Sequence, residues 1–148
     1  MTERMLVAVA DSPASMTAAR TAVTLAARLG AEVRAVHVVQ DGDITTLIGT
    51  ASRRGHLSER RDASAVAVLR YVAGLCERAG VPATTVQRDG EVGTSILAEA
   101  KAWGADLVVL GRTTRRGSGQ PFLSVDTQQV LEFAERPVLI VPSGDPSG

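Results

Sequence analysis

The stretch that most constrains the fold is residues 104–142, GADLVVLGRTTRRGSGQPFLSVDTQQVLEFAERPVLIVP. Two of its segments, Asp106 to Leu110 and Val138 to Val141, have the apolar character of strands buried on both faces of a sheet. Between them, a polar loop from Arg112 to Gln120 precedes a helix-like apolar stripe over residues 121–134. Parallel strands need a crossover of about a dozen or more residues, usually helical and right-handed. This stretch therefore predicts a strand, loop, helix and strand of a parallel α/β sheet.

The rest of the chain shows the same alternation of strand and helix patterns. Strands are expected at Met5 to Ala10, Glu32 to Val39 and Ala83 to Arg88, and helices at residues 15–29, 59–79 and 94–103. The third strand is more polar than the others and is expected at a sheet edge, whereas residues 40–58 fit neither pattern. Five strands alternating with four helices predict an α/β doubly wound, open five-stranded sheet with helices on both faces. We expect one domain over residues 1–142 and a polar tail over residues 143–148.

Composition excludes several classes of protein. The 16 basic and 16 acidic side chains cancel, so nothing indicates bulk attraction to nucleic acid or to an anionic membrane. Aromatic residues make up 3% of the chain, too few for base-stacking platforms. No apolar run approaches the roughly 20 residues that span a bilayer. The single cysteine excludes an internal disulfide and suits a reducing compartment, so we expect a cytoplasmic protein with neither nucleic acid nor membrane as partner.

The loop after Leu110 is the leading candidate for a binding site. It leaves the carboxyl end of a central strand and feeds a helix amino terminus, which is where open α/β sheets bind ligands. Gly111, with Arg112, Arg115 and Arg116, has the chemistry to hold a small anionic ligand through backbone N–H groups and positive charge. The alternative is a solvated, mobile loop. Neither G-x-x-x-x-G-K-[ST] nor G-x-G-x-x-G occurs in the sequence.

Other polar residues give weaker signals. Asp11 and Ser12 follow the first strand and have two interpretations, contact with a polar ligand or capping of the next helix. His37 and His56 have no neighbours at metal-ligand or catalytic spacing, and Cys76 lies on an apolar helical face where core packing is expected. No nucleophile, base and orienting group can be assembled, so we expect no catalytic residue and no metal site.

Three segments together resemble the universal stress protein family, and the resemblance covers nearly the whole chain. They are LVAVADSP with the following AEVRAVHVV, the central GEVGTSILAEAKAWGADLVVLGR, and the closing VLEFAERPVLIVP. The resemblance implies strand order 3-2-1-4-5, a role in stress survival or signalling, and homodimers that pair through the last strand. That strand comprises Pro137, Val138, Leu139, Ile140 and Val141.

Many members of this family bind ATP through G-x2-G-x9-G-[ST] after the fourth strand, and the match here is incomplete. Gly111 aligns with the first glycine, but Thr114 and Ser124 replace the other two and Val125 replaces the hydroxyl residue. Side chains at these positions obstruct the approach of backbone to phosphate. The family's first-strand aspartate aligns with Ala10, although Asp11 follows it. Asp126, in the first turn of the next helix, would repel a phosphate placed there.

Three functional hypotheses follow. The first is a universal stress protein-like cytoplasmic homodimer that acts as a binding or regulatory module in the stress response, with a degraded nucleotide motif. The second is a functional binder of ATP or another adenine nucleotide, and the third is a slow ATP hydrolase, which the missing catalytic set disfavours. In the second hypothesis the loop arginines meet the phosphates, and the pocket is lined by Asp11, Val38, Gly111, Thr114, Ser124, Val125 and Thr127.

Overall fold

The computed structural model describes residues 3–40, 51–114 and 121–143. The parallel strands are β1 (Arg4–Ala8), β2 (Glu32–Val39), β3 (Ala83–Asp89), β4 (Leu107–Thr114) and β6 (Val138–Pro142). They lie in the order β3-β2-β1-β4-β6. This order confirms the expected 3-2-1-4-5 arrangement, with β6 as the fifth parallel strand. The polar third strand lies at an edge of the sheet, as its composition predicted.

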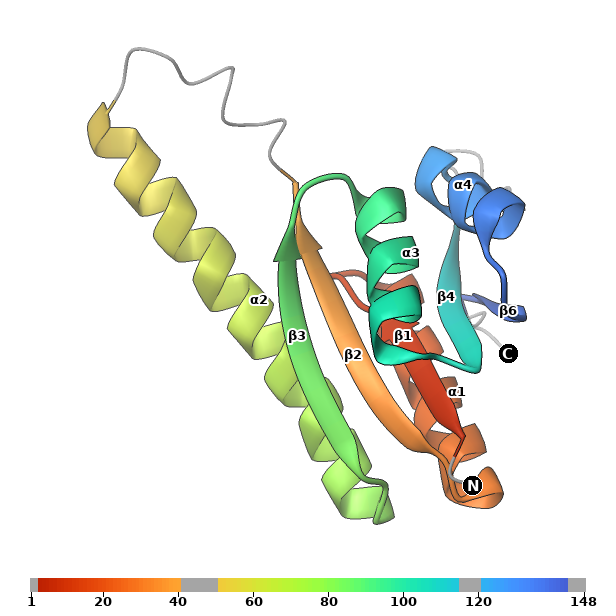
Figure 1. Cartoon of the computed structure of the whole chain (residues 1–148). Helices are drawn as coiled ribbons and strands as arrows, with labels where there is room; N and C mark the ends of the chain where they lie inside the picture. The colour runs from red at the N-terminus through yellow and green to blue at the C-terminus, as the bar shows by residue number, and fades with distance from the viewer. Residues whose placement is uncertain (1–2, 41–50, 115–120, 144–148) are drawn as a thin grey trace.

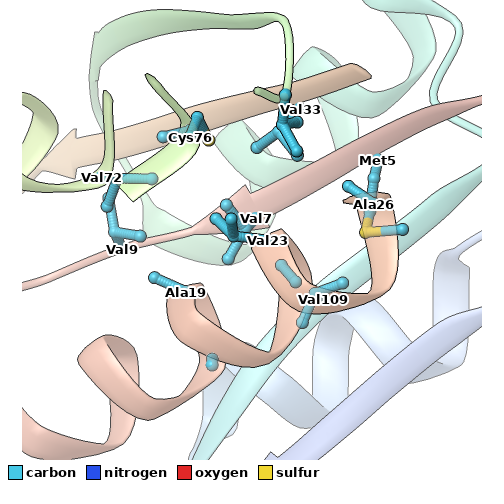
Figure 2. Packing of buried hydrophobic residues seen from close by; sticks show 14 of the residues in the cluster. Met5, Val7, Val9, Ala19, Val23, Ala26, Val33, Val72, Cys76 and Val109 are labelled. Atoms are coloured by element: carbon cyan, nitrogen blue, oxygen red, sulfur yellow. The ribbon is translucent and has the colours of Figure 1, made fainter. Parts of the chain in front are cut away.

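Two pairs of helices cover the two faces of the sheet (Figure 1). Helices α1 (Pro13–Leu29) and α2 (Ala51–Ala79) pack on one face, and α3 (Val92–Trp103) and α4 (Val125–Phe133) pack on the other. Alternate strand residues therefore enter two separate cores, because successive side chains of a strand point to opposite faces. Met5 and Val7 pack against α1 and α2, whereas Leu6 packs against α3 and α4. Figure 2 shows the first of these cores, which includes the buried Cys76.

Two predicted boundaries on either side of the candidate loop were wrong. The helix expected over residues 121–134 begins only at Val125, because Pro121–Phe122 forms a short strand, β5, antiparallel to Thr113 and Thr114. Strand β4 accordingly extends through Arg112 to Thr114, where a loop was expected. The backbone pairing of β5 with β4 therefore replaces the first turn of the expected helix. The helix expected from residue 59 begins at Ala51.

The ends of α1 are specified locally. Ser12 caps its amino terminus, with Oγ accepting a hydrogen bond from Ser15 N at 3.2 Å, and Pro13 occupies the first turn, where its missing N–H costs nothing. Gly30 ends the helix in the left-handed conformation, φ 67°, and its N–H bonds to Ala26 O. The capping interpretation of Ser12 is therefore confirmed. None of the helices in the described part of the chain is long and apolar enough to cross a bilayer.

A buried ion cluster joins α3 to the edge of the sheet. The Glu99 side chain is only 6% exposed, and its carboxylate accepts hydrogen bonds from Arg34 Nη1 at 3.0 Å and Arg88 Nε at 2.9 Å. Arg34 also lies 4.8 Å from the ring centre of Trp103, a cation–π distance. Burial alone would raise the pKa of Glu99, but the hydrogen bonds and charges of Arg88 and Arg34 outweigh it and hold that pKa below its ordinary value. The cluster fixes α3 against β2 and β3.

We expect Glu99→Gln to lower the free energy of unfolding by about 1.5–3 kcal/mol near neutral pH, the typical contribution of hydrogen bonds to a charged group. Because the pKa of Glu99 is depressed in the folded state, its contribution is complete above the ordinary value of 4.5 and is lost as the pH falls through the lower, folded value. The deficit of the variant should therefore shrink in acid. Urea titrations at several pH values measure this, with the exposed Glu77→Gln as control. A deficit that does not change with pH would contradict it.

Candidate functional site

A cavity opens at the carboxyl ends of the central strands, between β1 and β4. Its volume is ≈ 150 Å³. Strands β1 and β4 are neighbours, yet the chain leaves β1 for α1 on one face and leaves β4 for α4 on the other. A crevice at such a divergence is the usual ligand position in an open α/β sheet. The lining comprises Ala8, Val9, Ala10, Ser15, Val36, Val38, Val92, Ile96, Leu110, Gly111, Ser124, Asp126 and Thr127.

Gly111 brings β4 into backbone contact with α1. A Cβ atom at this position would lie 2.5 Å from Ala14 O and 2.7 Å from Ala14 C. Both are backbone atoms of the first turn of α1, so neither can rotate away as a side chain could. The glycine that aligns with the start of the nucleotide motif is thus required by helix packing in this chain, whatever the cavity holds.

The amino terminus of α4 forms one wall of the cavity. Ser124 caps this helix, because its Oγ accepts a hydrogen bond from Thr127 N at 3.2 Å. The same hydroxyl donates to Thr127 Oγ1 at 3.0 Å. The Ser124 hydroxyl is therefore used to cap α4, at the position where the family motif has a glycine.

Asp126 links the first turns of two helices. Its Oδ1 accepts a hydrogen bond from Gly93 N of α3 at 3.2 Å. The N-cap residue of α3, Glu91, makes no side-chain cap of its own. A carboxylate at the positive end of a helix dipole is stabilising, and this one also lies in the first turn of α4. Asp126 therefore places a negative charge of the chain itself at the wall of the cavity.

A second hollow, of ≈ 290 Å³, adjoins the first, since Ala10, Val38 and Val92 line both. His37 lies on its wall, together with Val39, Gln40 and Ser64. His37 Nδ1 is 2.9 Å from Val9 O. The position of His37 on this wall was not predicted, because it depends on β1 and β2 lying side by side.

The structure brings together some of the predicted site residues and separates others. Val38, Gly111, Ser124 and Thr127 line the strand-end cavity. Asp11 is exposed and absent from the lining, Val125 is 81% exposed, and Arg112 lies on β4 outside the lining. Thr114 ends β4, but its side chain, like Arg115 and Arg116, lies outside the described part.

Chemical groups for catalysis do not converge on the described part of the cavity. No cluster of three or more His, Cys, Asp or Glu side chains suited to a metal occurs among the residues described. Cys76 is buried in the core between α2 and the sheet, and this burial raises the pKa of its thiol, so the position favours packing over reactivity.

A larger hollow, of ≈ 370 Å³, lies between α3 and α4 near the start of β4. Its walls are mostly apolar, with Lys101 and Arg136 among the lining residues. It lies away from the carboxyl ends of the strands and lacks the helix amino termini that surround the first cavity. We therefore assign the candidate site to the strand-end cavity.

Comparison with known proteins agrees with this architecture. Residues 1–142 match the family model described as the universal stress protein family. The chain is 33% identical over 147 residues to the universal stress protein YxiE of Bacillus subtilis, covering 95% of this chain and 99% of that protein.

Solved structures share the fold. Universal stress protein UspA from Lactobacillus plantarum superposes with a TM-score of 0.75 at 26% identity, covering 94% of this chain and 97% of that one. A universal stress protein in complex with cAMP has a TM-score of 0.69 at 18% identity, covering 97% of this chain and 98% of its own. A universal stress protein family protein from Arabidopsis thaliana with AMP bound has a TM-score of 0.71 at 17% identity, covering 98% of this chain and 94% of that one.

The packing of Gly111 predicts that Gly111→Ala lowers the free energy of unfolding by about 1–3 kcal/mol, the usual cost of overpacking. The matched control is Gly74→Ala in α2, where a Cβ would meet only a side-chain atom, Arg78 Nη1, at 3.4 Å. That control should be neutral or stabilising by up to about 1 kcal/mol, because alanine has the higher helix propensity. Chemical denaturation compares the two, and equal effects would refute the packing argument. Any substitution at Gly111 is consequently a poor probe of ligand binding alone.

Proposed function

The chain belongs to the universal stress protein family, and we propose that it acts in the stress response as a binding or regulatory module whose strand-end cavity does not hold ATP. The observation that carries this proposal is the position of Asp126, whose carboxylate lines the cavity and already bonds to the amino terminus of α3. A phosphate placed there would meet a negative charge where a phosphate site offers free N–H groups.

The repulsion that a phosphate would meet at Asp126 supports this proposal. Two unit charges 4 Å apart repel by about 1 kcal/mol in water and about 4 kcal/mol at the effective dielectric of a protein surface. A triphosphate carries several such charges. Ser124 adds a side chain where the motif has a glycine, and its hydroxyl is already committed to Thr127.

The second candidate is a working adenine-nucleotide binder. The observation that favours it is the strand-end cavity itself, because structural relatives of this chain were solved with cAMP and with AMP. Each of these ligands carries a single phosphate and so less negative charge than ATP. The arginines of the loop would have to compensate for Asp126.

We expect freshly purified protein, when denatured, to release no stoichiometric ATP or ADP by mass spectrometry, and ATP titration to give only heat of dilution. Asp126→Asn removes the charge and retains an oxygen that accepts from Gly93 N, so this variant should bind ATP at least about fivefold more tightly than the wild type. The matched control is Glu132→Gln, which removes an exposed charge from the same helix outside the cavity. Stoichiometric nucleotide released from the wild-type protein would establish the second candidate instead.

We also propose a cytoplasmic homodimer that pairs through β6. The hydrogen bonds Val108 N to Pro137 O and Ser143 N to Arg112 O show that the odd-numbered residues of this segment face β4. Because strand residues alternate, the N–H groups of Val138 and Ile140 face away from β4. A second copy of β6 would satisfy these groups, whereas an open apolar edge would promote aggregation. The free, buried Cys76 suits a reducing compartment.

Ile140→Pro tests the dimer, because proline removes an outward N–H and leaves the ladder to β4 intact. We expect sedimentation velocity to show a dimer for the wild type and for Ile140→Val, and a monomer for Ile140→Pro. Circular dichroism checks that each variant is folded. A wild type that remains monomeric at the highest soluble concentration would overturn the proposal.

A further inference from the structure

We infer that the hollow between α3 and α4 near the start of β4, named the wedge pocket here, binds an aliphatic monocarboxylate of about eight to ten carbons. This site is separate from the one on which the proposed function depends. The buried Ile96 lines both the wedge pocket and the strand-end cavity and so lies between the two spaces.

The wedge pocket lies beyond the point where α3 and α4 are held together. At their amino ends, Asp126 accepts a hydrogen bond from Gly93 N, and Gln129 Nε2 donates to Thr94 Oγ1 at 3.0 Å. Gly93 is so close to Gln129 that a Cβ atom on it would overlap that side chain. Farther along both helices a space of ≈ 370 Å³ remains open. The lining there includes four small residues, Ala100, Gly104, Ala105 and Ala134.

The inner wall of the wedge pocket is apolar. Ile96, Val108 and Val130 form it, and each is at most 3% exposed. A ligand with polar groups along its length would leave them without hydrogen-bond partners here, which is costly. Phe133 lines the same pocket and is 63% exposed, so it offers apolar surface that a bound chain would remove from water. The walls therefore select an aliphatic chain.

Two cations supply partners for a carboxylate head group. Lys101 and Arg136 line the pocket and are exposed, and within the described part of the chain neither forms an ion pair or a hydrogen bond. Glu135 is the single carboxylate of the lining. The partial charge of a helix carboxyl end, about half a unit, is smaller than the full charge of either cation. A ligand carboxylate would form charge-assisted hydrogen bonds, roughly twice as strong as neutral ones.

The volume of the pocket limits the length of the chain. At about 30 Å³ for a group the size of a water molecule or a methylene, ≈ 370 Å³ accommodates about twelve such groups. Decanoate, with ten carbons and two oxygens, matches this size. Each methylene that enters the pocket should raise the affinity about fourfold, and the gain should end when the pocket is full.

Calorimetric titration of the full chain with hexanoate, octanoate, decanoate and dodecanoate tests this size limit. We expect the affinity to rise about fourfold per methylene up to decanoate and to gain little from decanoate to dodecanoate. Decanol has the same chain without the charge and should bind at least about tenfold more weakly than decanoate, and decylamine more weakly still. Saturating ATP should not displace decanoate.

Variants separate the head group from the chain. Lys101→Gln and Arg136→Gln should each weaken decanoate about tenfold and leave decanol unchanged. Their matched control is Arg28→Gln, which removes an exposed cation from the last turn of α1. Ala100→Leu fills the pocket and should weaken both ligands at least about tenfold, whereas Ala67→Leu, exposed on α2, should weaken neither. Circular dichroism checks that each variant is folded.

Several results would overturn the inference. They are the absence of saturable decanoate binding, a decanol affinity equal to that of decanoate, and displacement of decanoate by ATP. A wild type that ignores decanoate but dissociates from dimer to monomer in Ala100→Leu would make a second copy the occupant instead. Failure of decanoate to bind leaves the proposed function standing. The wild-type ligand series is decisive even where a variant does not fold.

Discussion

The parallel pairing of β1 with β4 is the constraint on which the rest of the structure depends. Met5, Leu6 and Val7 pair with Leu107, Val108 and Val109 in the centre of the sheet. From these two neighbouring strands the chain departs to opposite faces, so backbone cannot fill the space above their carboxyl ends. The cavity, the amino termini around it and the division into two cores all follow from this one pairing. It requires apolar side chains on both faces, and these two segments supply them.

Close packing of backbone explains why a fragment of a nucleotide motif persists here. Gly111 lies under the first turn of α1, where a Cβ would come within 2.5 Å of a carbonyl oxygen. A glycine in that position is needed for the fold even in a chain that binds no phosphate. Ser124 likewise has a structural role, because it caps the amino terminus of α4. Single motif residues are therefore weak evidence for a ligand, because helix packing and capping select the same residue types at the same places.

Carboxylates hold α3 in place at two points of this protein. Asp126 of the neighbouring helix bonds to the amino terminus of α3, and Glu99 of α3 binds Arg34 of β2 and Arg88 of β3. Both interactions tie α3 to another element. The Asp126 side chain both bonds to α3 and is expected to exclude phosphate from the cavity. The stability of the α3–α4 layer is therefore linked to the choice of ligand.

The sequence alone determined the class of fold, because the alternation of apolar runs and helical stripes is local and its period is set by backbone geometry. It also placed the polar third strand at an edge and the candidate site after the fourth parallel strand. It did not predict β5 or the start of α4 at Val125, since an antiparallel pair formed with Thr113 and Thr114 overrides a local helix pattern. Only the tertiary structure showed that Asp126 bonds to Gly93, that Val125 turns outward and that His37 lines the adjoining hollow. These facts depend on side chains from strands and helices distant in sequence, whose meeting is decided by how the layers pack.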